Sequence, residues 1–214
     1  MIIAIDGPSG SGKSTLGRML ARALNLLYID TGSMYRAVAL AVIEADVDPA
    51  HAEAVTELAN RIDINLEGDP ESLSVLLDGR DVTDQIRTEG VSAMSSIVSS
   101  IPGVRRAMVA RQREMGQRGA VLNGRDIGTV VFPEADVKFF LTAVPEERAE
   151  RRFREDESAS STLAQTLAEM IERDRRDSTR ADSPLRAADD AIVIDSTGKN
   201  IEEVFQEMIG KIKR

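Results

Sequence analysis

Residues 7–14 read G-P-S-G-S-G-K-S and carry every fixed residue of the phosphate-binding pattern G-x-x-x-x-G-K-[ST]. The glycines let the backbone curl so that successive N–H groups point inward and form a nest for an anion. Lys13 can reach the β- and γ-phosphates of a nucleotide, and the Ser14 hydroxyl can bind Mg²⁺. This chemistry predicts an ATP site formed by Gly7, Pro8, Ser9, Gly10, Ser11, Gly12, Lys13, Ser14 and Thr15.

The flanking residues favour this interpretation over a glycine-rich turn with a surface lysine. An apolar run over 1–5 precedes the segment, and apolar residues recur at helical spacing over 16–24. The segment therefore lies where a strand turns into a helix. The positive end of the helix dipole adds to the attraction for an anion.

Two further polar turns follow predicted strands. Residues 30–36 read D-T-G-S-M-Y-R, and residues 123–129 read N-G-R-D-I-G-T. Ligands of open α/β sheets bind beyond the carboxyl ends of the strands, so both turns are candidates for a second anion site. The alternatives are a helix cap at Thr31 or Ser33 in the first turn and a surface ion pair in the second.

An arginine-rich segment is another candidate for phosphate binding. Residues 148–180 contain eight arginines and eight acidic residues but no lysine. Forked guanidinium groups suit phosphate better than ammonium groups do, which favours an anion clamp over a solvated face held by ion pairs. One helix face, at spacings i, i+3, i+4 and i+7, would carry Arg173, Arg176, Asp177 and Arg180.

Short apolar runs alternating with helical segments must position these residues. They predict βαβ units and a five-stranded parallel sheet flanked by helices, within one α/β domain over 1–214. Helix starts are marked by Pro102, by Thr162 with Gln165 three residues later, and by Asn200. The expected strands are 2–5, 27–29, 120–122, 137–141 and 191–194.

A long insertion separates the second and third expected strands. Within 62–82, strand-like pieces alternate with turn residues and predict a small antiparallel sheet. We expect residues 31–100 to form an acceptor-binding subdomain. A hairpin that does not contact substrate is the alternative.

Composition limits the classes of function. The net charge of −9, from 27 basic and 36 acidic residues, disfavours binding to nucleic acid or to anionic membranes. The absence of cysteine excludes a thiolate nucleophile, and the single histidine, His51, is expected on an exposed helix start. No apolar run reaches the ~18 residues of a spanning helix. We therefore expect a soluble, cytoplasmic protein.

Taken together, the motifs resemble those of the bacterial cytidylate kinases, which belong to the nucleoside monophosphate kinases. The similarity extends over essentially the whole chain. It is carried by I-D-G-P-S-G-S-G-K-S-T at 5–15, D-T-G-S-M-Y-R at 30–36, I-R-T at 86–88, N-G-R-D-I-G-T-V-V-F-P at 123–133 and E-R-D-R-R-D-S-T-R at 172–180.

The resemblance implies a P-loop kinase fold, a monophosphate-binding insertion and a short lid over 146–162 that contains Arg148 and Arg152. It implies transfer of the ATP γ-phosphoryl group to CMP or dCMP, giving ADP and CDP or dCDP, with Mg²⁺ as cofactor. Nothing in the sequence demands more than a monomer.

The resemblance also assigns residues. Lys13, Arg173 and Asp126 would be catalytic, with Arg173 facing the transferring phosphoryl group. The acceptor nucleotide would be held by Thr31, Arg36, Ser96, Arg105, Arg125, Asp126, Asp177 and Arg180.

One residue departs from the family pattern. The phrase after the third strand usually reads D-G-R-D, and here it begins with Asn123. An amide can orient a metal-bound water but adds no negative charge. We therefore name Ser14 and Asp30 as the metal candidates.

Two other functions fit part of the pattern. A kinase for a small hydroxyl-bearing metabolite would use Asp30 or Asp126 as a base. A regulatory module that binds ATP without transferring phosphate would explain residues 7–14 alone.

Overall fold

The computed structural model describes residues 1–155 and 161–212. The chain forms two compact units, one made of Met1–Tyr28 with Arg118–Arg214 and the other of Ile29–Gln117. The chain thus leaves the first unit once and returns to it.

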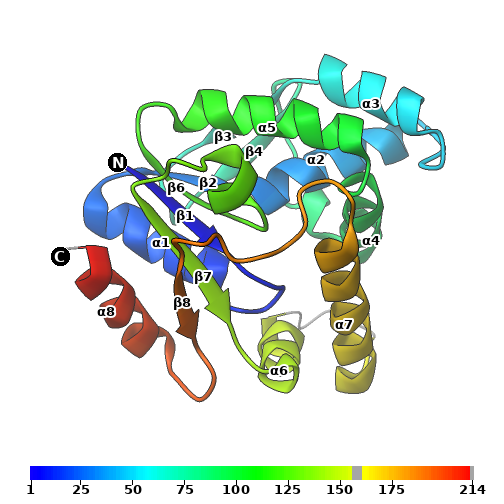
Figure 1. The fold of residues 1–214 in the computed structure, drawn as a ribbon. Coiled ribbons are helices and arrows are strands. Elements are labelled where there is room, and N and C mark those ends of the chain that lie inside the picture. The colour runs from blue at the N-terminus through cyan, green and yellow to red at the C-terminus, as the bar shows by residue number, and fades with distance from the viewer. Residues whose placement is uncertain (156–160, 213–214) are drawn as a thin grey trace. The chain divides into compact units, whose positions relative to one another are not determined.

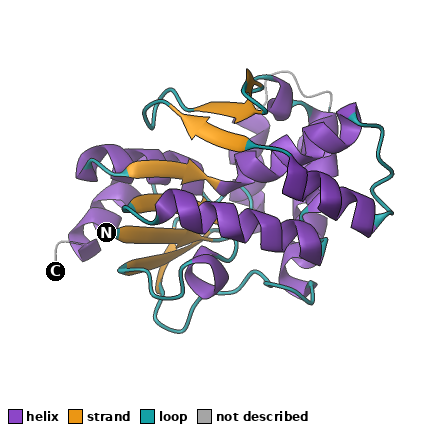
Figure 2. Ribbon diagram, turned by 90° about the horizontal axis from the view of Figure 1, so that it is seen from above, coloured by secondary structure: helices purple, strands orange, loops and turns teal. Residues whose placement is uncertain are grey.

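The first unit contains a five-stranded sheet whose strands lie in the order β2-β6-β1-β7-β8 (Figures 1 and 2). β1 pairs in parallel with β6 and β7, and β7 pairs in parallel with β8. This confirms the predicted α/β fold class. The strands are β1 (Ile2–Asp6), β2 (Leu27–Asp30), β6 (Ala120–Gly124), β7 (Val137–Thr142) and β8 (Ile192–Asp195).

All five expected strands are present, and each ends one or two residues later than predicted. The apolar pattern stops where side chains become polar, but backbone pairing continues. Ile5 lies opposite Asn123 and Asp6 opposite Gly124. The register therefore places the turn after β6 beside the loop after β1.

The last two helices of the first unit begin at the caps that the sequence predicts. α1 lies against β6 and beside α8, and α6 packs on α7 (Figure 1). The predicted capping box of Thr162 and Gln165 is present, and Asn200 accepts from the Glu203 N–H at 2.9 Å. The helices are α1 (Lys13–Leu24), α6 (Pro145–Glu155), α7 (Leu163–Thr179) and α8 (Ile201–Ile212), and a π-type turn, η2, spans Ile127–Val131.

The second unit contains the predicted antiparallel sheet. β3 (Ile64–Glu67), β4 (Ser74–Leu77) and β5 (Arg80–Asp81) form it in chain order. Asp78 and Gly79 connect β4 to β5 with positive φ angles of 50° and 78°. The unit also contains α2 (Thr31–Glu44), α3 (Ala52–Arg61), a 3₁₀ turn η1 (Gln85–Arg87), α4 (Glu89–Val98) and α5 (Pro102–Gly116).

α2 is the central helix of this unit. Its residues from Ala37 to Val42 are all buried, which an amphipathic surface helix would not permit. It contacts α3, α4 and α5. Pro102 opens α5 as predicted.

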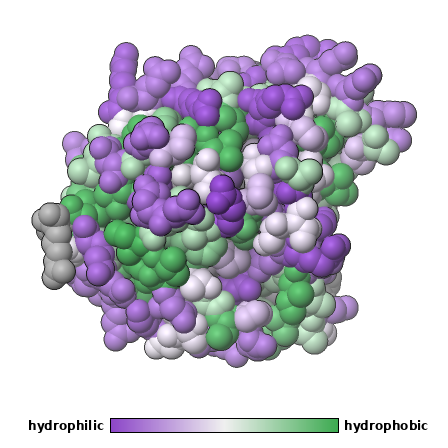
Figure 3. All heavy atoms as spheres, in the orientation of Figure 1, coloured by the Kyte–Doolittle hydropathy of each residue, from purple (hydrophilic) through white to green (hydrophobic). Residues whose placement is uncertain are grey.

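Polar side chains dominate the face drawn in Figure 3, as expected for a chain with 29% charged residues. His51 is exposed at the start of α3, as predicted. Within the described residues, no helix is both long and apolar enough to cross a bilayer.

We predict that Gly17→Ala destabilises the fold by about 1–3 kcal/mol because it overpacks α1. A Cβ at Gly17 would lie 2.8 Å from Cε2 of Tyr28. Gly210→Ala in α8 is the matched control, since a Cβ there meets nothing within 4 Å. Urea denaturation should show the control equal to or more stable than wild type. A Gly17→Ala variant of wild-type stability would contradict the prediction.

Candidate active site

The phosphate loop joins β1 to α1, and its shape requires glycine. A Cβ at Gly7 would lie 2.1 Å from the Leu141 carbonyl oxygen, and one at Gly10 would lie 2.6 Å from that of Arg148. Gly12 ends the loop with φ of 89°. Ser11 Oγ donates to the Pro8 carbonyl at 3.0 Å and closes the turn.

Lys13 is buried at the start of α1, where its Nζ donates to the Pro8 carbonyl. Burial holds the pKa of Lys13 well below its usual value, and the nearby Arg125 and Arg173 lower it further. The carboxylates of Asp6 and Asp174 act in the opposite direction. The loop is therefore a site of concentrated positive charge that a bound anion would stabilise.

Ser14 and Asn123 form the part of the site that suits a metal. Asn123 Nδ2 donates to Ser14 Oγ at 3.1 Å, and Asn123 is buried at the end of β6. Mg²⁺ usually takes one or two protein ligands and completes its shell with waters and phosphate oxygens. A hydroxyl ligand supported by an amide fits that requirement.

Asp30, the other metal candidate, caps α2. Its Oδ1 accepts from the Gly32 N–H at 3.1 Å and its Oδ2 from the Ser33 hydroxyl at 3.0 Å. The helix-cap interpretation of this turn is therefore correct, with Asp30 as the capping residue instead of Thr31 or Ser33. Asp30 as a metal ligand stays a prediction.

Asp6 is a residue of this region that sequence reasoning missed. Its two carboxylate oxygens each accept at 2.8 Å, from the N–H groups of Ile127 and Gly128. Burial raises the pKa of Asp6 to about 6, Asp126 adds to the increase, and the backbone hydrogen bonds oppose it. The only signal in the sequence was an acidic residue directly after an apolar run. Asp6 ties β1 to the η2 turn.

An ion-pair network joins α7 to the turn after β6. Arg125 Nε donates to Asp177 Oδ2 at 2.9 Å. Arg180 lies 3.6 Å from Asp177 Oδ1 and 3.8 Å from Asp126 Oδ1. Burial alone would raise the pKa of Asp177, but Arg125, Arg173 and Arg180 hold it below its usual value. The structure thus brings together four of the predicted acceptor residues.

The rest of the predicted arginine face divides between two environments. Arg173 is half-buried, and its charge acts on Lys13 and Asp177. Arg176 lies 3.7 Å from Glu172, which also pairs with the exposed Arg175 at 2.8 Å. The solvated ion-pair interpretation therefore applies to Arg176.

The predicted lid spans 146–162, and residues 156–160 of it lie outside the described residues. Arg148 and Arg152 belong to α6. The Arg148 side chain is buried and donates to the Ser9 carbonyl at 2.9 Å. Arg152 is half-buried.

The remaining predicted acceptor residues lie in the second unit. Thr31 is buried in the first turn of α2, and Arg36 lies in the turn after it. Arg105 of α5 is also buried, with its guanidinium 5.5 Å from the ring centre of Tyr35. It donates to the Ser99 carbonyl at 3.2 Å, one turn beyond Ser96 of α4.

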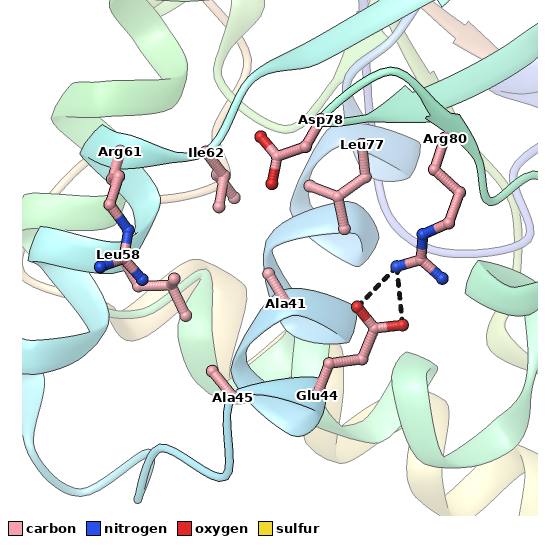
Figure 4. A pocket seen from close by; sticks show the side chains of 9 residues that line it. All are labelled: Ala41, Glu44, Ala45, Leu58, Arg61, Ile62, Leu77, Asp78 and Arg80. Atoms are coloured by element: carbon pink, nitrogen blue, oxygen red, sulfur yellow. Dashed lines mark hydrogen bonds and ion pairs between the residues drawn. The ribbon is translucent and has the colours of Figure 1, made fainter.

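A hollow of about 690 Å³ opens elsewhere in this unit (Figure 4). Glu44 and Arg80 form a two-pronged ion pair on one wall, at 2.6 and 2.8 Å. None of the predicted acceptor residues lines it. Its residues are Ala41, Glu44, Ala45, Leu58, Arg61, Ile62, Leu77, Asp78 and Arg80.

A parallel sheet with a glycine-rich loop, lysine and serine between its central strand and a helix defines a P-loop nucleotide-binding protein. Residues 3–214 match the family model for cytidylate kinase. The cytidylate kinase of Solibacter usitatus is 52% identical over 219 residues, covering 100% of this chain and 92% of that protein. The cytidylate kinase of a Geobacter species is 47% identical over 216 residues, covering 100% and 93%. This chain belongs to the cytidylate kinase family.

A solved structure of an uncharacterized protein from Eubacterium ventriosum has the same fold. Its TM-score is 0.56 at 12% sequence identity, and the match covers 100% of this chain and 98% of that one. At that identity the similarity extends to the fold alone.

Asp6 predicts a pH dependence of stability. Its pKa is 3.8 without the protein environment and about 6 in the fold, so between these values the native state binds more protons than the unfolded chain. Stability contributed by this group therefore falls as pH rises through that window. Relative to Asp6→Asn, wild type should lose about 1 kcal/mol of unfolding free energy between pH 5 and pH 8. Urea denaturation at several pH values measures this, and parallel profiles would contradict it.

Proposed function

We propose that this chain transfers the γ-phosphoryl group of ATP to CMP or dCMP, giving ADP and CDP or dCDP. The observation that carries the proposal is the concentration of cationic groups around the phosphate loop. The charges of Arg125 and Arg173 both act on Lys13 there, although the chain as a whole has a net charge of −9. Membership of the cytidylate kinase family supports the same reaction.

ATP binds in the loop between β1 and α1. The backbone N–H groups of the loop and the positive end of α1 hold its phosphates, and Lys13 contacts the β- and γ-phosphates. The Ser14 hydroxyl would hold Mg²⁺, and Asn123 supports that hydroxyl from the end of β6. When bound, Mg²⁺ neutralises charge on the transferring phosphates.

The acceptor needs no general base. A phosphate monoester has a second pKa of about 6 and is already anionic at neutral pH. In keeping with this, Asp126 lies beside Arg180, where it can orient a nucleotide contact. The acceptor is held by Thr31, Arg36, Ser96, Arg105, Arg125, Asp126, Asp177 and Arg180.

Charge on the moving phosphoryl group is shared among fixed cations. Lys13 and Arg173 face it, and the lid arginines of α6, Arg148 and Arg152, share the charge. Phosphoryl transfer asks mainly for in-line positioning and neutralisation, which this arrangement supplies without covalent chemistry.

The enzyme acts as a cytoplasmic monomer. Its net charge of −9 disfavours binding to nucleic acids and anionic membranes, because both carry negative charge.

A hydroxyl acceptor is less well supported. Both oxygens of Asp30 accept hydrogen bonds within the α2 cap, and Asp126 lies near a buried guanidinium. Neither carboxylate is arranged as a base. A module that only binds ATP would not explain the ion pair between Arg125, in the turn after β6, and Asp177 of α7.

The proposal is tested by a substrate panel with purified protein. ADP formation is followed with CMP, dCMP, UMP, AMP and a set of hydroxyl acceptors. We expect kcat/KM to be highest for CMP and dCMP. Preference for a hydroxyl acceptor, or no ADP formation with any of them, would overturn the proposal.

Arg173→Ala should lower kcat by about 10³-fold or more while ATP binding changes little, because Arg173 acts on charge that develops during transfer. Arg175→Ala is the matched control on the same helix, since the Arg175 side chain is exposed and pairs with Glu172. Steady-state kinetics and calorimetric ATP titration measure both effects. Near-normal kcat in Arg173→Ala would rule out its assigned role.

A further inference from the structure

Asp174 of α7 lies between the phosphate loop and α6. Its Oδ1 accepts from the Ser9 N–H at 3.3 Å, and its Oδ2 accepts from Arg148 Nη1 at 2.6 Å. The same Arg148 nitrogen donates to the Ser9 carbonyl at 2.9 Å. Ser9, Arg148 and Asp174 thus form a closed ring of contacts, which we call the loop brace.

The loop brace is held firmly by its surroundings. Arg148 Nε donates to the Ala143 carbonyl at 2.9 Å, so the guanidinium is fixed from a second side. The side chains of Arg148 and Asp174 are only 6% and 18% exposed. Gly10 lets α6 approach the loop this closely, since any Cβ there would meet the Arg148 backbone. Charge-assisted hydrogen bonds between side chains with so little solvent exposure are strong and directional.

The brace connects the loop to the acceptor side of the site. Asp174 directly follows Arg173 on α7 and lies one turn before Asp177. Asp177 in turn accepts from Arg125 at the end of β6. Hydrogen bonds therefore connect the loop at Ser9 to α7, and α7 to the turn after β6.

We propose that Asp174, held by Arg148, is a positioning residue that couples occupation of the phosphate loop to the acceptor-binding face of α7. Nucleotide in the loop fixes Ser9, Ser9 fixes Asp174, and Asp174 sets the helix that carries Arg173 and Asp177. Binding of donor and acceptor is then linked, and the linkage is reciprocal. The identity of the two ligands rests on the proposed function.

Asp174→Asn tests the coupling with little change in shape. The amide oxygen can accept from Ser9 or from Arg148, but the NH₂ group that replaces the other oxygen repels the remaining donor. CMP is titrated calorimetrically with and without a saturating non-hydrolysable ATP analogue and Mg²⁺. In wild type we expect the analogue to tighten CMP binding by about fivefold or more, and in Asp174→Asn by less than about twofold.

A second measurement does not depend on the acceptor. Hydrogen exchange of the α7 amides is compared with and without the analogue alone. Slowing of exchange over 173–180 is expected in wild type and should be lost in Asp174→Asn. Glu172→Gln is the matched control, because it breaks an exposed ion pair on the same helix and should behave as wild type in both measurements.

The outcomes separate the two proposals. Retention of both effects in Asp174→Asn overturns the brace, and so does loss of stability with equal weakening of both ligands, which marks a merely structural role. Wild-type slowing of exchange without CMP binding keeps the brace and overturns the proposed acceptor. In both measurements, Arg148→Met combined with Asp174→Asn should add little to the loss of coupling in Asp174→Asn alone, because both changes break the contact between Arg148 and Asp174, and full additivity would overturn the brace.

Discussion

The positive charge of Lys13, carried into a buried position beside two arginines, is the constraint around which the first unit is arranged. Like charges in a poorly solvated site repel strongly, by about 4 kcal/mol at 4 Å for an effective dielectric constant near 20. Burial is the main cause of the lowered pKa of Lys13, and repulsion of this kind from Arg125 and Arg173 lowers it further. Carboxylates from separate elements oppose it: Asp6 at the end of β1 and Asp174 on α7. Each also makes a contact that fixes the backbone of a neighbouring turn. Charge compensation and positioning are thus performed by the same side chains.

Ionisation of the buried Asp6 side chain costs free energy in this arrangement. A carboxylate whose pKa is raised to about 6 is ionised at neutral pH against the preference of its surroundings. Its two backbone hydrogen bonds recover part of that free energy, but a neutral side chain would avoid the desolvation entirely. Asp177 is the opposite case, since arginines hold its pKa low and make ionisation favourable. The two carboxylates lie in one unit and differ because one faces N–H groups and the other faces guanidinium groups.

The features that the sequence predicts are those determined locally. The phosphate loop, the apolar strands and the caps at Pro102, Thr162 and Asn200 depend on residues within a few positions of one another. Asp6 and Asp174 were missed because their partners are distant in sequence: Asp6 binds a residue 121 positions away, and Asp174 one 165 positions away. Helical periodicity does not indicate Asp174, because it lies beside the face defined by Arg173 and Asp177. Tertiary packing, which no local periodicity specifies, decides these contacts.

The amide of Asn123 reverses the direction of the hydrogen bond between residue 123 and Ser14. The amide donates to Ser14 Oγ, whereas the carboxylate that the family pattern places there would accept from that hydroxyl. The hydroxyl proton of Ser14 is therefore not donated to residue 123, as it would be with a carboxylate there, and it remains available for another acceptor. An amide also adds no charge beside Asp6, whose ionisation is already opposed by Asp126. Asn123 therefore still hydrogen-bonds to Ser14, and it adds no third carboxylate beside Asp6 and Asp126.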